Sequence, residues 1–417
     1  MQNFPRSLLA SPLLHHADFL KLWIGQSISL VGTEITLLAL PLTAIQVLHA
    51  SPLQVATLAA VERIPNLALS LPTGVLADRV RRRPLLIAAN LGRAIVLAGI
   101  PLAAFLGVLT LPLLYVVSFV TTSLGLVFDN AYAGFLPSLI RPEQLLDGNS
   151  KLEVSRTAAS TVGPGLAGFL IQTLTAPLAI LFDSVSYLVS IAALALIEAP
   201  ERPPETRPGS AWHDLREGVA FVLGRPIIRS MILAVGAANL FLGGLVAEYI
   251  LFMTNTLHLS PASIGWLIAA GGASGIAGAL LGGTVGRVIG AGRAMMLGGM
   301  VYGLGALVLA LAQGALPQIV LFVVAGEVLM GISASIYTVN FVSLVQTDVP
   351  APLLGRTNSL STLVISGTVP IGALLGGAVA QTAGLRPTLV AVGCGVILAF
   401  GALIFSPVYR FHGHESS

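Results

Sequence analysis

The chain has 417 residues, of which 55% are hydrophobic and only 9% are charged, whereas a soluble domain carries about 25% charged residues. This composition excludes an ordinary soluble globular protein. The single cysteine, Cys394, excludes an intrachain disulfide and a cysteine-rich metal site. The net charge of +3 comes from basic residues in short connections, so we expect no nucleic-acid partner.

In chain order, the sequence contains twelve apolar segments, each long enough to cross a bilayer as an α-helix of roughly 20 residues. They lie at residues 19–47, 53–77, 85–107, 111–137, 152–173, 177–198, 228–256, 262–286, 294–313, 317–345, 357–383 and 387–406. Lys and Arg gather in the connections on one side of the membrane, whereas the opposite connections contain only Arg386. The positive-inside rule therefore predicts a multi-pass protein with both termini in the cytoplasm.

The sequence repeats itself at an offset of about half its length. Residues 74–80, GVLADRV, recur as GGTVGRV at 282–288, an offset of 208. The tetrapeptide HASP at 49–52 recurs as HLSP at 258–261, an offset of 209. Such a repeat predicts two halves of six helices each, in parallel orientation. The second copy has Gly286 where the first has Asp78, so the halves are not equivalent.

One stretch breaks the apolar composition and divides the chain into domains. Residues 199–226 are rich in Pro, Glu and Arg, which opposes a packed core. We therefore predict an N-terminal six-helix bundle at 1–198, a cytoplasmic linker at 199–226, and a C-terminal bundle with a short cytoplasmic tail at 227–417. Residues 211–223 form either an amphipathic helix on the membrane surface or plain linker.

A basic loop joins the second and third segments. Residues 74–86 read GVLADRVRRRPLL and resemble the loop signature of the major facilitator superfamily, Gly-x-Leu-Ala-Asp-Arg-x-Gly-Arg-Arg/Lys. The matching positions are Gly74, Leu76, Ala77, Asp78, Arg79, Arg82 and Arg83. Arg81 stands where the family has its second glycine. The resemblance implies a gating loop, in which Asp78 and Arg79 latch the two halves together on the cytoplasmic side.

Further segments resemble the drug:proton antiporter branch of that superfamily, which includes macrolide-efflux-like proteins. They are VFDNAY at 127–132, LLDGNSKLEVSR at 145–156 and YTVNFVSLVQ at 337–346. Gly163, Pro164 and Gly168 are similar to the fifth-helix antiporter motif, although Ala159 and Ala167 replace two of its glycines. Glycine and proline let such a helix bend and pack closely.

The resemblance implies an all-α membrane protein with the major facilitator fold, in which twelve transmembrane helices form two pseudo-symmetric six-helix bundles. It also implies a secondary transporter that works by alternating access, without a cofactor or a bound metal. No HExxH, GxSxG or GxxxxGK[ST] pattern occurs in the sequence. We therefore expect neither an enzyme nor an ATP-driven pump.

Charged residues inside the apolar segments are the candidate functional groups, because such charges are expensive in a bilayer and face a cavity or a partner. The candidates for proton coupling or substrate binding are Glu34, Asp129, Glu248 and Glu327, with Glu34 the first choice; Asp183 is a further intramembrane carboxylate. Glu62 and Arg63 are expected to pair with charges on other helices, and Arg93 is a candidate partner. The residues expected to line the cavity are Gln26, Ser29, Thr33, Thr36, Tyr115, Tyr337 and Asn340.

Three functions remain open. The first is proton-driven export of small amphipathic molecules, multidrug or macrolide-like, because a carboxylate in a low-dielectric cavity can load and release protons. The second is uptake or facilitated diffusion of a small solute, or siderophore-type export, on the same fold. The third, a membrane enzyme or receptor, has no motif in its favour. The expected partners are a small-molecule substrate, protons and the lipid bilayer, for a monomer in a bacterial cytoplasmic (inner) membrane.

Overall fold

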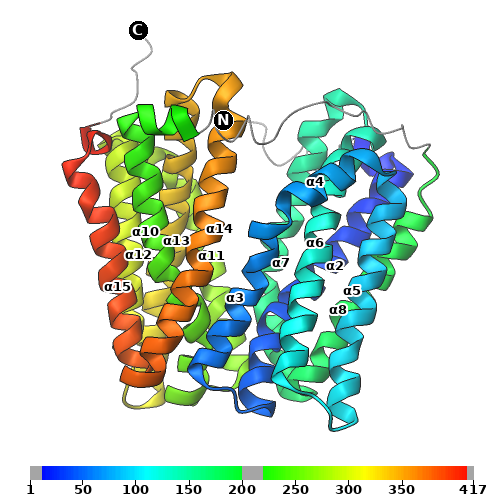
Figure 1. The fold of residues 1–417 in the computed structure, drawn as a ribbon, viewed down its shortest axis with the longest axis horizontal. Helices are drawn as coiled ribbons and strands as arrows, with labels where there is room; N and C mark the ends of the chain where they lie inside the picture. The colour runs from blue at the N-terminus through cyan, green and yellow to red at the C-terminus, as the bar shows by residue number, and fades with distance from the viewer. Residues whose placement is uncertain (1–11, 200–218, 411–417) are drawn as a thin grey trace. The chain divides into compact units, whose positions relative to one another are not determined.

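The computed structural model describes residues 12–199 and 219–410, and all regular structure in these ranges is helical. The chain divides into two compact units, Met1–His49 with Ala68–Pro208 and Ala50–Leu67 with Gly209–Ser417 (Figure 1). The first unit contains α2 (Ala17–Leu42), α4 (Ser70–Arg79), α5 (Arg82–Phe105), α6 (Leu111–Leu139), α7 (Leu145–Thr173) and α8 (Ala176–Ala195). The second contains α3 (Pro52–Ala68), α10 (Pro226–Leu251), α11 (Pro261–Ile289), α12 (Ala291–Ala310), α13 (Leu316–Asp348), α14 (Ala351–Ala383) and α15 (Leu385–Gly401).

Ten of the helices in the described ranges are long and apolar enough to cross a membrane, with or without a short continuation at one end. The two remaining predicted spans have features that explain their absence from this set. The segment predicted at 53–77 is divided between α3 and α4, which meet at Leu69. α7 carries four charged residues, Asp147, Lys151, Glu153 and Arg156, between residues 145 and 156.

Several helices extend beyond their predicted ends. α7 begins at Leu145 rather than at residue 152, and α14 begins at Ala351 rather than at residue 357. Hydropathy locates the part of a helix that suits lipid, but a helix continues into water wherever its backbone hydrogen bonds continue. The segment 211–223, expected to be either a surface helix or plain linker, lies mostly outside the described residues. Residues 219–224, which the structure describes, are helical.

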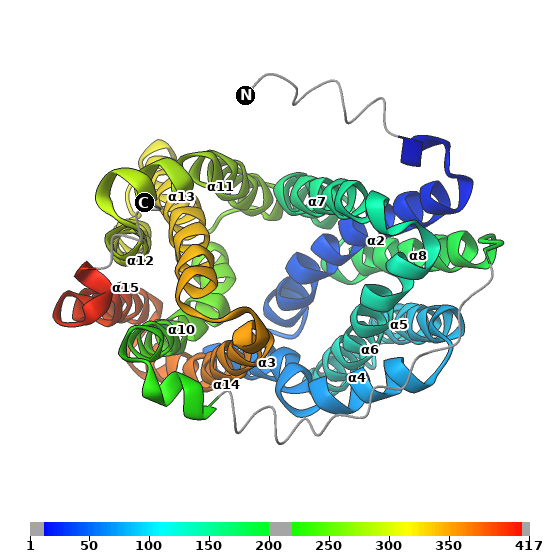
Figure 2. The ribbon, with the colours of Figure 1, turned by 90° about the horizontal axis from the view of Figure 1, so that it is seen from above.

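Within the first unit, α2 packs against α7 and α8, and α5 packs against α6 and α8. Figure 2 shows α2 and α8 running side by side. Small residues permit the close approach: a Cβ atom at Gly25 would collide with Ala193, and one at Gly32 with Ser186. A buried cluster that includes Phe19, Leu86, Phe135 and Leu194 fills the end of the unit where α4 meets α5.

Within the second unit, α10 packs against α14 and α15, while α13 packs against α11 and α12. The α10–α14 crossing is close, because a Cβ atom at Gly243 or Gly372 would collide with the backbone of the other helix. α3 joins this unit through Ala56 and Ala60, which pack with Ala247 of α10. The contacts thus group residues 50–67 with the second unit, and the domain boundaries at 198 and 227 stay a prediction.

The repeated HASP and HLSP segments adopt the same local structure. α2 ends in a π-helical turn, Thr43–Val47, and α10 ends in another, Phe252–Thr256. His49 and His258 then take left-handed backbone conformations, with φ of 50° and 53°. The serine and proline that follow begin α3 and α11. The sequence repeat is therefore also a repeat of backbone geometry.

Candidate functional site

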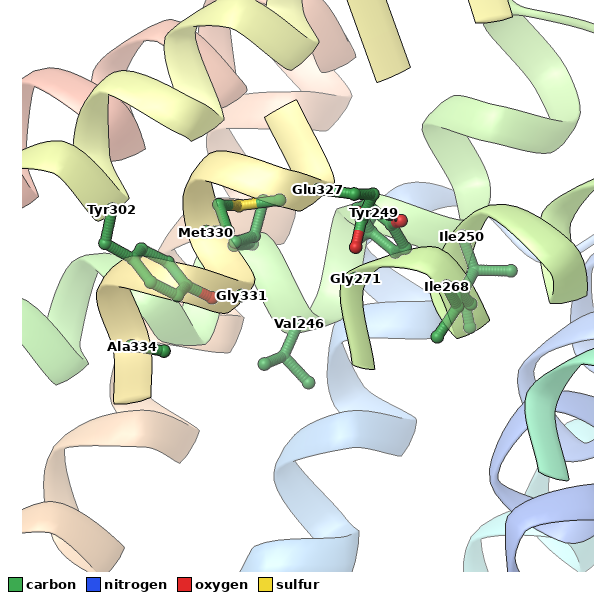
Figure 3. Close-up of a pocket in the computed structure, with 11 residues that line it drawn as sticks. Val246, Tyr249, Ile250, Ile268, Gly271, Tyr302, Glu327, Met330, Gly331 and Ala334 are labelled. Carbon is green, nitrogen blue, oxygen red and sulfur yellow. Dashed lines mark hydrogen bonds between the residues drawn. The ribbon is translucent and has the colours of Figure 1, made fainter. Parts of the chain in front are cut away.

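A cavity of about 420 Å³ lies inside the second unit, among α10, α11, α12 and α13. Glu327 of α13 lines it and is 8% exposed. The hydroxyl of Tyr249 on α10 donates a hydrogen bond to a carboxylate oxygen of Glu327 (Figure 3). The other lining residues are Leu245, Val246, Ile250, Ile268, Gly271, Tyr302, Met330, Gly331 and Ala334.

The glycine on α11 makes room for the carboxylate. A Cβ atom at Gly271 would collide with the second carboxylate oxygen of Glu327, so only glycine lets α11 approach it so closely. Tyr302 of α12 turns its hydroxyl end toward α13 (Figure 3). Its ring and the ring of Tyr249 are the two aromatic walls of the cavity.

This cavity combines apolar walls with one acidic group. None of its eleven lining residues is basic, so Glu327 has no cation beside it in the lining. A cavity of this kind is the usual setting for a small ligand, with apolar surface for binding and few polar groups for orientation. Chemically, Glu327 can hold a proton or attract a cationic group, and the two would compete for the same carboxylate oxygens.

The first unit holds a different polar cluster, centred on Asp183 of α8. Asp183 is 1% exposed. Thr36 of α2 donates a hydrogen bond of 2.6 Å to one carboxylate oxygen, and Ser186 donates one of 3.2 Å to the other. Tyr187, one residue further on, forms a 3.2 Å hydroxyl hydrogen bond with Thr33. The carboxylate is thereby tied to both helices of the α2–α8 pair.

Arg93 of α5 supplies the positive charge of this cluster. Its guanidinium carbon lies 4.0 Å from the ring centroid of Tyr187 and 6.0 Å from that of Phe128, which is cation–π geometry. It interacts electrostatically with Asp183 and with Asp129. The first unit therefore balances its buried carboxylate with hydroxyl donors and an arginine.

Glu34 lies elsewhere on α2, where this helix crosses α7. A Cβ atom at Gly163 would collide with the Cβ and Cγ atoms of Glu34, so the acidic side chain packs directly on the glycine. Glu34 is half-buried, and Gly163, Pro164 and Gly168 are buried. Two sets of residues predicted separately, the first-choice carboxylate and the antiporter-like motif, thus meet at one crossing.

A family model described as transmembrane secretion effector, MFS_3, matches residues 8–416. The chain belongs to this family of major facilitator superfamily transporters. The prediction of the superfamily is therefore confirmed, and so is the prediction that the chain is not an enzyme, because the family and its relatives are transporters.

Curated relatives cover nearly the whole transporter. The multidrug efflux pump Tap of Mycolicibacterium fortuitum is 28% identical over 393 residues, which is 91% of this chain and 93% of that protein. The enterobactin exporter EntS of Escherichia coli O1:K1 / APEC is 26% identical over 377 residues, which is 88% of this chain and 86% of that protein.

Solved structures show the same fold at lower identity. The nucleoside transporter NupG matches with a TM-score of 0.76 and 11% identity, over 94% of this chain and 99% of that one. A bacterial homologue of the iron transporter ferroportin, in an inward-facing state, matches with a TM-score of 0.75 and 18% identity, over 96% and 99%. The predicted fold class, a twelve-helix major facilitator fold, is confirmed.

The basic loop of the transporter uses two of its arginines inside the first unit. Arg82 donates a hydrogen bond of 2.9 Å to the carbonyl oxygen of Gly134 on α6. Arg83 donates to the carbonyl oxygens of Leu194, at 2.8 Å, and Ala195, at the end of α8. Cations suit a helix C-terminus because its carbonyls carry partial negative charge.

The remaining residues of the predicted gating loop are more open. Asp78 and Arg79 end α4 with exposed side chains, and Gly74 is half-buried with open space around it. The latching role of Asp78 and Arg79 stays a prediction.

The predicted cavity-lining residues lie in several environments. Ser29 is buried in α2, and Thr33 and Thr36 form hydrogen bonds with residues of α8. Thr33 and Thr36 therefore face α8. Asn340 is buried and donates to the carbonyl oxygen of Gly282, at 3.0 Å, across the α11–α13 pair. Tyr337 packs edge-on against Phe400 at 5.2 Å between ring centroids. Gln26 and Tyr115 are half-buried.

The other predicted charges are not brought to one site. Asp129 is exposed on α6, and Arg63 is exposed on α3. Glu62 is half-buried on α3. Because Glu62 and Arg63 lie in the second compact unit and Arg93 in the first, the predicted pairing among them stays a prediction. Glu248 is fully buried on α10, outside the cavity lining.

Sequence reasoning missed Asp183 as a site residue, and it missed Tyr249, Tyr302 and Gly271. A signal for Asp183 was present, since Ser186 and Ser190 follow it on an otherwise apolar helix. Nothing local marked the tyrosines, because their partner Glu327 lies 78 residues away from Tyr249 in sequence.

Proposed function

We propose that this transporter exports small amphipathic molecules in exchange for protons, by alternating access, and that Glu327 is its proton-binding group. The observation that carries the proposal is the apolar cavity whose single carboxylate accepts a hydrogen bond from Tyr249. A proton on Glu327 neutralises the cavity, and its loss exposes a negative charge in an apolar wall. Substrate and proton therefore favour different states of the same side chain.

The names of the relatives support export rather than uptake. One is a multidrug efflux pump and another an enterobactin exporter. The cavity supports an amphipathic substrate, because aliphatic and aromatic side chains provide most of its wall. Glu34, which packs on Gly163, is the second candidate for coupling, and Asp129 is the third.

The direct test is transport by purified protein in proteoliposomes. Ethidium, a macrolide and a siderophore serve as probes, each with and without an imposed pH gradient. The parent should concentrate at least one probe only when the gradient is present. Glu327→Gln, which fixes a neutral side chain of nearly the same shape, should lose gradient-driven accumulation and keep exchange of that probe across the membrane.

A matched control is Glu153→Gln, on the exposed start of α7, where the side chain is 70% exposed. It should transport like the parent. Glu327→Gln that still concentrates the probe would reject Glu327 as the coupling group. Concentration by the parent without a pH gradient would reject proton exchange itself.

We further propose that the transporter lies in the bacterial cytoplasmic membrane as a monomer, with both termini in the cytoplasm. The excess of Lys and Arg in the connections on one side supports this orientation. A reporter active only in the cytoplasm, fused after Ser417, should be active. A reporter active only outside the cytoplasm should be silent at the same position.

A further inference from the structure

Glu248 is the least exposed carboxyl group in the described part of the second unit, and it does not line the cavity. Its relative exposure is 0%, against 8% for Glu327. Neither of its carboxylate oxygens has a hydrogen-bond partner among the residues that the structure describes. Buried polar groups almost always have such partners, so this side chain requires an explanation other than packing.

The face of α10 that carries Glu248 packs against α15. The side chain of Phe241 lies against Gly395, and a Cβ atom at Gly244 would contact Val392. Because these helices run antiparallel and Glu248 follows Phe241 by seven residues and Gly244 by four, all three share one helical face. The register places Glu248 level with Thr388 of α15, which is 2% exposed.

Among the described residues, the charged groups near this level of α10 are engaged elsewhere. Arg386, at the start of α15, donates to the carbonyl oxygens of Ala310, at 2.7 Å, and Ala312, at 2.8 Å. The part of α14 that packs on α10 from residue 364 to 383 contains no titratable side chain, nor does α3 from 52 to 61. On α12 and α13, the titratable groups near this level, Tyr302 and Glu327, face the cavity.

We infer that Glu248 is a second proton-binding site of the second unit, closed off from the cavity, and that it holds its proton while α10 and α15 stay packed. An isolated carboxylate in an apolar interior is so unfavourable that the group remains neutral instead. The two acidic groups then differ in access. Glu327 exchanges its proton with the cavity, whereas Glu248 exchanges only when the α10–α15 seam opens. Its place in a transport cycle rests on the proposed function, but the proton itself does not.

The test is infrared spectroscopy of the purified full-length protein in lipid, without any substrate. A protonated carboxyl group gives a carbonyl band that an ionised one lacks. The wild type should keep such a band from mildly acidic to alkaline pH, and Glu248→Gln should lose it. Glu327→Gln should keep this band and lose one that follows the pH of the medium. If the wild type has no band that resists alkaline pH, or Glu248→Gln retains it, the inference is wrong.

A second measurement protects the test against poor folding of Glu248→Gln. If native Glu248 is protonated and the unfolded chain releases that proton at neutral pH, the unfolding constant rises with pH by up to tenfold per unit. Glu248→Leu, whose side chain suits an apolar seam, should fold and should lack this contribution. An equal pH dependence in wild type and Glu248→Leu would contradict the inference. Neither measurement involves transport. If the proposed export is wrong, the infrared band and the pH dependence of unfolding still show whether Glu248 holds a proton.

Discussion

The two compact units hold their buried acidic groups in opposite ways. In the first, Asp183 accepts hydrogen bonds from Thr36 and Ser186 and lies within the field of Arg93. In the second, Glu327 accepts one bond from Tyr249, and Glu248 has no partner among the described residues. A single carboxylate in an apolar helix therefore says little about its role. We expect its partners and its access to a cavity to decide whether it serves as a structural charge or exchanges a proton.

A second difference lies in one repeated helix crossing. Glu34 on α2 packs on Gly163 of α7, and the positions 209 residues later are Gly243 on α10 and Gly372 on α14. These glycines also meet, but there backbone touches backbone. The first crossing thus holds an acidic side chain where the second holds only a close helix contact. Both copies of the repeat thus have a glycine at the crossing, Gly163 or Gly372. Gly163 makes room for the Glu34 side chain, whereas Gly372 makes room for the backbone of α10.

The largest effect is expected at the second crossing. In Gly372→Ala, the added methyl group would collide with the carbonyl of Leu240, and neither backbone can move without separating α10 from α14. Overpacking of this kind destabilises by about 1–3 kcal/mol or more. Gly372→Ala should therefore give little folded protein by size-exclusion chromatography. Gly163→Ala should fold better, because it meets the side chain of Glu34.

The control for this comparison is Gly283→Ala on α11, where a Cβ atom would meet open space. It should fold as well as the parent. Equal yields of Gly372→Ala and Gly163→Ala would show that the two crossings tolerate the same strain.

The next largest effect is expected at Asp183. Asp183→Asn removes one of the two carboxylates that interact with Arg93 and weakens the hydrogen bonds from Thr36 and Ser186. Loss of such partners costs about 1–3 kcal/mol, so the melting temperature in detergent should fall. The double variant Asp183→Asn with Arg93→Gln should lose less than the sum of the two single changes, because the groups are coupled.

Glu327→Gln supplies the contrast from the second unit. It should change the melting temperature little, because no arginine beside the cavity depends on that carboxylate. If Glu327→Gln destabilises as much as Asp183→Asn, the distinction between a structural and an exchangeable carboxylate is lost.

The sequence was sufficient for the fold and insufficient for the site, for physical reasons. Apolar length and Arg placement report directly on the bilayer, so the twelve-helix fold could be predicted, and the offset between His49 and His258 located a repeated backbone turn. The ends of α7 and α14 could not be predicted, because their charged turns are helical but do not suit lipid. The role of Asp183 depends on Thr36, 147 residues away, and no local pattern reveals such a partner.

Comparing Glu34→Gln with Glu327→Gln tests which of the two units couples transport to protons. Glu34→Gln should reduce accumulation driven by a pH gradient while keeping exchange of the probe, and by less than Glu327→Gln does. Asp129→Asn should give a still weaker defect, seen as lower protein yield. Flux in proteoliposomes with and without the gradient measures all three. Full loss of coupling in Glu34→Gln, with normal coupling in Glu327→Gln, would move the coupling role to the first unit.

Asp78 sharpens the comparison of the repeated loops, since Gly286 takes its place in the second copy. A carboxylate near the C-terminus of α4 opposes the helix dipole by about 0.3–1 kcal/mol. Asp78→Asn should therefore leave stability and membrane insertion intact, or improve them slightly, while it lowers transport. That combination separates a latch from a folding role. Normal transport by correctly inserted Asp78→Asn would remove the latch hypothesis.

A last effect, on stability, is expected at the arginines that bond to the C-terminal carbonyls of a neighbouring helix, one in each unit. Arg83 bonds to the end of α8, where Lys21 also donates a hydrogen bond of 2.7 Å to Leu196. Arg386 bonds to Ala310 and Ala312 at the end of α12, and its guanidinium lies 5.6 Å from the ring centroid of Phe252. A cation at a helix C-terminus contributes about 0.3–1 kcal/mol when exposed and up to about 2 kcal/mol when partly buried.

Arg83→Gln should therefore lower the melting temperature less than Arg386→Gln, because Lys21 still bonds to the C-terminal end of α8. Added salt should diminish the effect at Arg83, which lies at an exposed helix end, more than the effect at Arg386. The double variant Lys21→Gln with Arg83→Gln should lower the melting temperature about as much as Arg386→Gln does. If its loss stays as small as that of Arg83→Gln, the two cations do not share one helix end.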